Sequence, residues 1–159
     1  MITIELVPTA TDDVRVLIGE LDQTLSAEYQ PEERHGLTLD AIFQPNIRFF
    51  LARLDGAAVG CGGVALYADY AEVKRMYVRD AVRGRGVAKS LLERIEQQTR
   101  ESGLGLLRLE TGVRQFAALR LYERAGFQRC PVFGAYAEMP PQAIATSIFL
   151  EKRLESSAA

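Results

Sequence analysis

The sequence predicts an α/β domain with a mixed, mostly antiparallel central sheet and helices on both faces. Three observations favour it: 159 residues of which 48% are apolar, a hairpin pattern in the first half, and alternating strand and helix patterns in the second. This length and composition suit one domain with a sizeable core, which we expect to span residues 1–159 with a frayed end over 156–159. Hairpins pair strands antiparallel and a strand–helix–strand crossover pairs them parallel, so the sheet is mixed.

The chain begins with a strand and a helix. Residues 2–7 alternate apolar and polar positions, as a half-buried strand does. After three residues of the N-cap type, apolar positions recur at helical spacing and predict an amphipathic helix that ends near Ala27. Residues 28–38 are predicted to form a polar loop, and residues 39–43 are predicted to form a short second helix.

Three strands follow. Strands over 49–54 and 58–67 flank Asp55 and Gly56, a pair typical of a tight hairpin turn. Glycines in the second of these strands indicate bulges or a close backbone approach. A strand over 71–78 follows antiparallel.

The second half alternates helices and strands. Helices are predicted over 86–102 and 115–125, each followed by a glycine that can take a left-handed stop. The strands run over 106–110, 127–130 and 145–150.

Composition limits the classes of partner. With 19 Lys and Arg against 21 Asp and Glu, the formal charge is −2 and argues against a nucleic-acid partner. The longest uncharged, apolar-rich stretch, residues 56–68, is too short to cross a bilayer, and the N-terminus lacks a signal-peptide pattern. We therefore expect a cytoplasmic protein with no membrane partner. Cys61 and Cys130 fit no metal spacing and His35 is the only histidine, so we expect no metal and reduced, buried thiols.

Charge is uneven along the chain. Residues 1–47 hold nine acids and two bases, whereas residues 74–94 hold seven bases and two acids. The basic segment predicts a local anion site, with a solvated helix face as the alternative.

A glycine- and arginine-rich segment lies between a predicted strand and a predicted helix. Its residues are Arg83, Gly84, Arg85, Gly86, Val87 and Ala88. Backbone amides at such a junction line the positive end of the helix dipole, and glycines let a diphosphate approach them. The spacing fits neither a Walker loop nor a dinucleotide-binding fingerprint, because Lys89 stands where the latter needs a small residue.

In this segment the chain resembles the GNAT superfamily of acyl-coenzyme A dependent N-acetyltransferases. The family signature of Gln or Arg, two residues, Gly, one residue, then Gly or Ala is met by Arg83, Gly86 and Ala88. The strand over 72–78 and the segment 121–127 supply the matching context, and the resemblance is strongest over 71–130. It implies a GNAT-like sheet whose strands splay apart at the cofactor site.

The resemblance also implies how acetyl-coenzyme A, the acyl donor, is bound. Amides of residues 83–88 would bind its diphosphate. The preceding strand would carry a bulge and diverge from the strand over 106–110, so that main-chain groups of Met76, Tyr77 and Val78 bind pantetheine. The Met76 amide would be a donor toward the thioester oxygen.

Two titratable groups are needed, because an ammonium must lose a proton before it attacks and the departing thiolate benefits from receiving one. Glu72 resembles the strand glutamate that serves as base in some family members, and the alternative is an ion-paired or solvent-facing glutamate near Lys74. Glu110 is the other candidate for base or amine-binding group. Tyr122 resembles the helix tyrosine that faces the coenzyme sulfur and acts as general acid in the family. The residue pattern alone, without this resemblance, indicates an aromatic side chain in the core.

Three further residues are weaker candidates. Gln115 stands near the position where many relatives have an Asn that contacts pantetheine or the substrate. For Tyr136 two roles are open: its side chain would either line the acceptor pocket or pack on the core. His35 lies in a loop that often borders the acceptor site in this superfamily, although an exposed loop histidine usually has no catalytic role.

The resemblance implies an N-acetyltransferase that moves the acetyl group of acetyl-coenzyme A to an amino group of a small molecule or peptide by direct attack. Neither cysteine lies in a motif that suggests a covalent nucleophile. The acidic first third favours a cationic acceptor. Two alternatives stay open, a non-catalytic coenzyme A binding module and a nucleotide-phosphate enzyme. A homodimer is expected at the level of the superfamily only.

Overall fold

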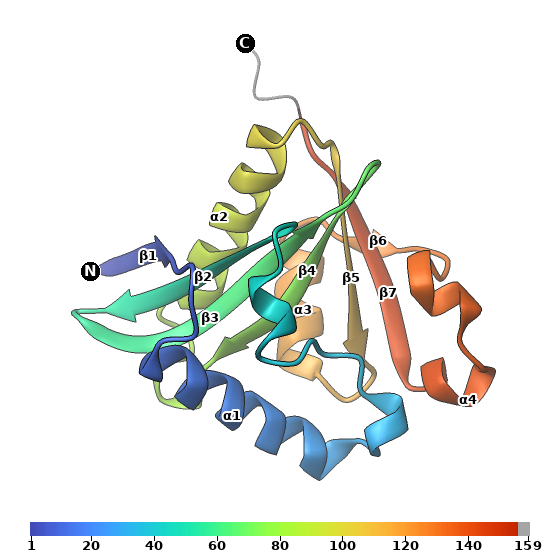
Figure 1. The fold of residues 1–159 in the computed structure, drawn as a ribbon, viewed down its shortest axis with the longest axis horizontal. Coiled ribbons are helices and arrows are strands. Elements are labelled where there is room, and N and C mark those ends of the chain that lie inside the picture. Colours follow the sequence, from blue (N-terminus) through green and yellow to red (C-terminus); the bar gives the residue numbers. More distant parts are fainter. Residues whose placement is uncertain (156–159) are drawn as a thin grey trace.

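The computed structural model describes residues 1–155 and contains a seven-stranded sheet of order β1-β2-β3-β4-β5-β7-β6 (Figure 1). The strands are β1 (Ile2–Leu6), β2 (Ile47–Leu54), β3 (Ala57–Leu66), β4 (Ala71–Val78), β5 (Leu106–Gly112), β6 (Gln128–Arg129) and β7 (Ser147–Arg153). Neighbouring strands pair antiparallel except β4 and β5, which are parallel. The predicted mixed, mostly antiparallel sheet is confirmed.

Helices cover both faces of the sheet. They are α1 (Asp12–Glu28), α2 (Val87–Glu101), α3 (Phe116–Arg124) and the short α4 (Pro141–Ile144). One apolar cluster joins α1 to Phe49 and Leu51, and the other joins α2 and α3 to Phe50. Successive β2 residues therefore enter opposite cores, as the period of two along a strand requires. Helices on both faces are confirmed.

Some predicted elements differ from the structure. The helix predicted over 39–43 is a single 3₁₀ turn, Ala41–Phe43, because so short a segment cannot complete two α-helical turns before Pro45. The strand predicted over 127–130 shrinks to β6, since the Phe127 amide donates to the Tyr122 carbonyl at 3.0 Å and so closes α3. Between the last two predicted strands lie a 3₁₀ helix, Gly134–Glu138, and the short α4, neither of which the sequence predicts.

Strand β4 is bulged and diverges from β5. Its register against β3 shifts between Cys61 and Gly63, and Arg75 takes the left-handed conformation with φ 54°. Strands β4 and β5 pair at only two positions, of which Glu72 with Arg108 is the last. Beyond Glu72, no strand in residues 1–155 pairs with β4 on that side. The predicted bulge and splayed strands are therefore present.

Glycine in β3 permits a close approach at the bulge. A Cβ atom at Gly62 would lie 2.8 Å from Met76 Sδ, closer than van der Waals contact allows. The absence of a side chain at Gly62 thus lets Met76 pack over β3 beside the divergence of β4 from β5.

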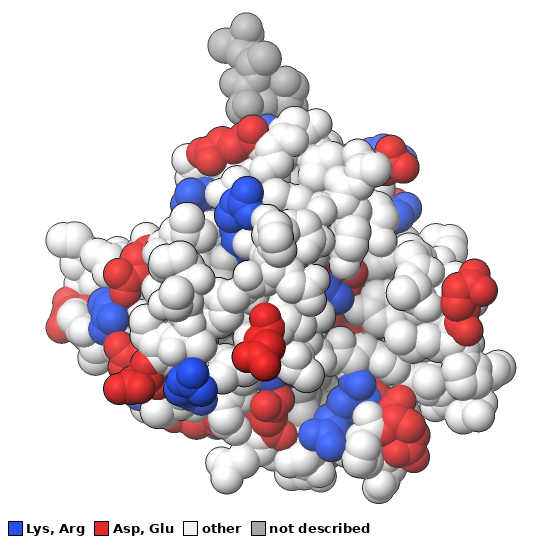
Figure 2. Space-filling view, in the orientation of Figure 1, with Lys and Arg blue, Asp and Glu red and all other residues white. Residues whose placement is uncertain are grey.

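No helix in residues 1–155 is long and apolar enough to span a membrane. Figure 2 shows acidic and basic side chains interspersed over the face in view, without one extended basic patch. The predicted fraying of residues 156–159 lies outside the described residues.

Candidate active site

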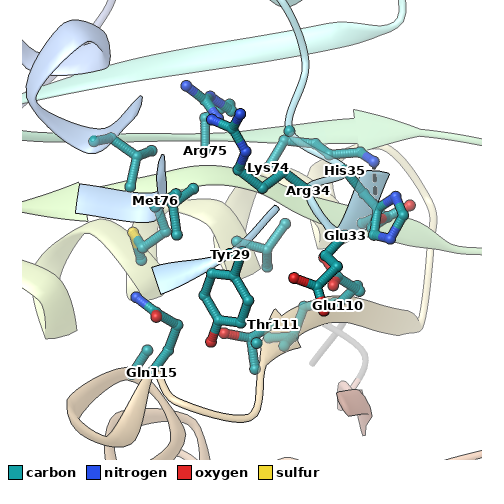
Figure 3. A pocket seen from close by; sticks show the side chains of 18 of the residues that line it. Tyr29, Glu33, Arg34, His35, Lys74, Arg75, Met76, Glu110, Thr111 and Gln115 are labelled. Atoms are coloured by element: carbon teal, nitrogen blue, oxygen red, sulfur yellow. Dashed lines mark ion pairs between the residues drawn. The ribbon is translucent and has the colours of Figure 1, made fainter. Parts of the chain in front are cut away.

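A cavity of about 140 Å³ lies where β4 and β5 diverge (Figure 3). Its walls come from the end of α1, residues 33–36, β4, β5 and the start of α3. A second cavity of about 270 Å³ shares His35, Glu72, Lys74 and Tyr136 with the first and adds Tyr67, Tyr70 and Met139. The strand divergence therefore opens a space into which several predicted site residues project.

Glu110 lies on β5 and lines the first cavity. Ser147, its neighbour on β7, donates a hydrogen bond from Oγ to Glu110 Oε2 at 2.6 Å. Burial raises the pKa of Glu110, and the Ser147 hydrogen bond and the nearby charge of His35 only partly offset that rise. Glu110 has no ion pair within residues 1–155. It is a half-buried carboxyl group that holds its proton more strongly than an exposed glutamate does.

Glu72 has different surroundings, although it also lines the cavity. Lys74 Nζ lies 2.9 Å from Glu72 Oε2, and the Tyr136 hydroxyl donates to the same oxygen at 2.6 Å. Lys74 Nζ also donates to the Tyr136 hydroxyl oxygen at 3.3 Å. Only 3% of Glu72 is exposed, so this network balances a buried charge. The ion pair with Lys74, the alternative weighed from the sequence, is present.

Tyr122 projects from α3 into the same cavity. Its ring packs edge-on against Phe127 with centroids 5.6 Å apart, and 4% of the residue is exposed. Burial, followed by the charge of Glu110, raises the pKa of Tyr122. In the described part of the chain its hydroxyl makes no hydrogen bond with another residue. Tyr122 is therefore both a core aromatic and a protonated hydroxyl facing the cavity.

Of the residues predicted to bind pantetheine, two line the cavity and two do not. Met76 and Gln115 line the cavity, from β4 and from the residue before α3. Tyr77 and Val78 are not among the lining residues; the Tyr77 hydroxyl donates to Glu20 Oε1 at 3.0 Å instead. Any contact that Tyr77 and Val78 make with a cofactor would thus involve their backbone.

The segment 83–86 is exposed and ends in the N-terminus of α2. Gly84 and Gly86 take left-handed φ values of 79° and 83°, which side chains disfavour. The Ser90 amide donates to the Gly86 carbonyl at 3.0 Å, so the amides of Val87 and Ala88 precede the first helical hydrogen bond. An ideal Cβ at Gly84 would meet no atom within 4 Å. Unsatisfied amides beside open space fit a diphosphate group.

His35 and Tyr136 belong to two segments far apart in the sequence, and both residues line both cavities. The His35 ring donates from Nε2 to the Ala143 carbonyl at 2.7 Å, which fixes the ring beside both cavities. The same ring packs edge-on against Tyr136 at 5.7 Å between centroids. Burial, followed by the charge of Glu72, raises the pKa of Tyr136. Both residues therefore belong to the site, which the sequence alone indicated only weakly.

Three residues of the cavity or its support have no signal in the sequence. Tyr29 is buried at the end of α1, where its hydroxyl accepts a hydrogen bond from the Arg114 amide at 2.8 Å. Arg34 lines the cavity from a segment whose polar composition indicated only a loop. Ser147 reaches Glu110 across β5 and β7. Tyr29 and Ser147 act through partners distant in sequence, and Arg34 reaches the cavity only through the fold, so no local pattern could identify these residues.

Comparisons with known proteins agree with this geometry. A family model described as the acetyltransferase (GNAT) family matches residues 16–127. The IAA acetyltransferase of Azospirillum brasilense is 43% identical over 145 residues, which cover 90% of this chain and 92% of that protein.

Solved structures share the fold. A proposed acyl-CoA N-acyltransferase from Klebsiella pneumoniae has a TM-score of 0.77 at 30% identity, covering 98% of this chain and 99% of that one. The PaiA N-acetyltransferase of Thermoplasma acidophilum, solved in complex with coenzyme A, has a TM-score of 0.67 at 18% identity, with coverages of 95% and 99%. The splayed sheet, the glycine-rich junction before α2 and the match over most of its length show that this chain belongs to the GNAT family of N-acetyltransferases.

Proposed function

We propose that this chain moves the acetyl group of acetyl-coenzyme A directly to an amino group of a small molecule or peptide, with Glu110 as general base and Tyr122 as general acid. The observation that carries the proposal is that both residues line one cavity at the point where β4 and β5 separate. We also place the enzyme in the cytoplasm, in keeping with its two free cysteines.

The donor would lie along the divergence. Within the predicted segment 83–88, the amides of Arg83 and Arg85 donate to the carbonyls of Asp80 and Val82, so the remaining amides would hold the diphosphate. The backbone of 76–78 would hold the pantetheine, which Gln115 would contact from the start of α3. When bound, acetyl-coenzyme A supplies an acyl group already activated as a thioester. The Met76 amide would donate toward the thioester oxygen, where negative charge develops.

Glu110 suits the role of base because its surroundings disfavour its ionised form. A base works best when its pKa lies near the working pH, and burial moves the pKa of Glu110 upward in that direction. The charge of Glu72 is already balanced by Lys74 and Tyr136. Glu72 remains the second candidate, since it lines the same cavity.

Tyr122 suits the role of acid because burial keeps its hydroxyl protonated. Within residues 1–155 that hydroxyl has no competing partner, so it can donate to the departing thiolate. Direct attack is supported by the cysteines: burial raises the pKa of Cys61 to about 12 and also raises the pKa of Cys130. Both thiols are therefore neutral at physiological pH and poor nucleophiles.

The test is release of free coenzyme A from acetyl-coenzyme A in the presence of a panel of amines, with wild-type protein and Tyr122→Phe. We expect turnover that the variant lowers by about 10²-fold or more, because the proton for the leaving thiolate is lost. Coenzyme A binding without turnover toward any amine would contradict the proposal and favour a binding module. Tighter binding of ATP than of acetyl-coenzyme A in calorimetry would favour a nucleotide enzyme.

A further inference from the structure

The charges that line the first cavity are mostly compensated by neighbours. The ionisable side chains are those of Glu33, Arg34, His35, Glu72, Lys74, Arg75 and Glu110. Lys74 pairs with Glu72, and Arg75 pairs with Asp22 of α1. Glu33 accepts a hydrogen bond from the Gln30 amide at 2.7 Å.

The positive charge of Arg34 is not balanced by a neighbouring carboxylate in residues 1–155. Arg34 forms no ion pair within residues 1–155, and its Nε atom is buried without a hydrogen-bond partner. A buried donor without an acceptor costs free energy of about 1–3 kcal/mol, so such groups are rare and indicate a missing partner. The missing partner of a guanidinium donor is an acceptor, and an anion is the strongest one.

Arg75 is a second arginine of this cavity with a buried nitrogen that lacks a hydrogen-bond partner in residues 1–155. This nitrogen is the Nε atom, whereas another nitrogen of its guanidinium group pairs with Asp22. The guanidinium lies against Gly36, where a Cβ atom would be 2.1 Å from Arg75 Nη1. Because Gly36 is only two residues from Arg34, the loop brings both guanidinium groups to one wall of the cavity. Figure 3 shows Arg34 and Arg75 together above Glu110.

Glu110 and Arg34 thus line the cavity with opposite charges, and neither forms an ion pair within residues 1–155. We propose that the acceptor is a dipolar small molecule, an amine that also carries a carboxylate or phosphonate, with Arg34 as the residue that binds the anionic group. This inference rests on the proposed function and adds the acceptor class to it. A guanidinium fork holds two oxygens of one carboxylate or phosphonate at once, which directs the amino group of the same molecule toward Glu110.

The experiment compares acceptors that differ only in the anionic group. Leucine and phenylalanine are assayed against leucinamide and phenylalaninamide, and alanine against 1-aminoethylphosphonate. We expect kcat/KM for each acid to exceed that for its amide by about tenfold or more, the usual effect of a charged hydrogen bond. The third pair distinguishes a carboxylate acceptor from a phosphonate.

Variants assign the preference to Arg34. Arg34→Gln is expected to reduce the ratio of acid to amide to about one, mainly through KM for the acid, and Arg34→Lys to restore part of it. Arg15→Gln, on the exposed surface of α1, is the matched control. Equal kcat/KM for acids and amides in the wild type, or an unchanged ratio in Arg34→Gln, overturns the inference and leaves the transferase proposal standing. No turnover with these acceptors while another amine of the panel is acetylated also overturns the inference and leaves the transferase proposal standing; no turnover with any amine overturns the proposed function, and this inference with it.

Discussion

At the scale of single residues, environment separates two carboxyl groups that share one cavity. Glu110 receives one hydroxyl donor, whereas Glu72 receives a lysine and a tyrosine. Glu72 is buried and Glu110 is half-buried, and burial raises the pKa of Glu110. A group that resists ionisation costs stability when it is charged, which is a common property of a base.

Replacing Glu110 should separate activity from stability. Glu110→Gln is expected to lower kcat/KM by about 10²–10⁴-fold, the usual contribution of general base catalysis. The effect of Glu72→Gln should be smaller, and Glu93→Gln, exposed on α2, is the control. The measurement is kcat/KM at saturating acetyl-coenzyme A. A larger loss in Glu72→Gln than in Glu110→Gln would transfer the role of base to Glu72.

The same variant should alter stability with a defined sign. The pKa of Glu110 is raised in the folded protein, so its contribution to the free energy of unfolding is present at low pH and lost as pH rises through the folded pKa. Glu110→Gln should therefore be more stable than the wild type at neutral pH. The difference should diminish at a pH below 4.5, the ordinary pKa of the group. Urea unfolding at both pH values measures it, and a destabilised variant at neutral pH contradicts the assignment.

Ser147 should tune the pH dependence of the reaction. Its hydrogen bond to Glu110 stabilises the ionised form and lowers the pKa of that group. Ser147→Ala should therefore shift the acidic limb of the kcat/KM profile to higher pH. An unmoved limb in Ser147→Ala would show that Glu110 does not control it. Ser90→Ala, on α2, controls for loss of a hydroxyl group.

At the scale of elements, the junction before α2 depends on backbone conformation and not on side chains. Gly84 has φ 79° and an open surrounding, and so does Gly103 at the end of α2. These two glycines share conformation and packing but lie at opposite ends of the helix. They therefore distinguish the role of the junction from the cost of a left-handed residue.

Alanine at Gly84 or Gly103 should lower the stability of the fold equally, but should affect the affinity for coenzyme A only at Gly84. Gly84→Ala and Gly103→Ala should each destabilise the fold by about 1 kcal/mol, the cost of a left-handed non-glycine residue. Only Gly84→Ala should weaken coenzyme A binding in calorimetry, because it disturbs the amides proposed to hold the diphosphate. Equal affinities in the two variants would place the diphosphate elsewhere.

The elements predicted from the sequence were correct where one periodic pattern covered a whole element. The bounds of β4 agree with the prediction, and α2 differs by one residue at each end. The helix predicted over 39–43 was wrong and the strand predicted over 127–130 was too long, because Pro45 follows the first segment and the bond from the Phe127 amide to the Tyr122 carbonyl closes α3 at the start of the second. Short elements depend on their surroundings more than on their own sequence.

At the scale of the whole molecule, donor binding should be coupled to folding. A ligand that binds only the folded state adds about 2.7 kcal/mol at a concentration one hundred times its Kd. Coenzyme A should therefore raise the urea midpoint of the wild type, whereas ATP at the same concentration should raise it less. An equal effect of the two ligands would contradict a site selective for the acyl carrier.

The sequence by itself determined the sheet class, the helices on both faces, the glycine-rich junction before α2 and the family, because each follows from local periodicity or a short motif. Only the tertiary structure decided which carboxyl group is compensated and which is not. The deciding contacts join residues far apart in the chain: Ser147 to Glu110, Tyr136 to Glu72, and His35 to Ala143. Burial and charge compensation arise when separate elements pack together, so no local pattern contains them.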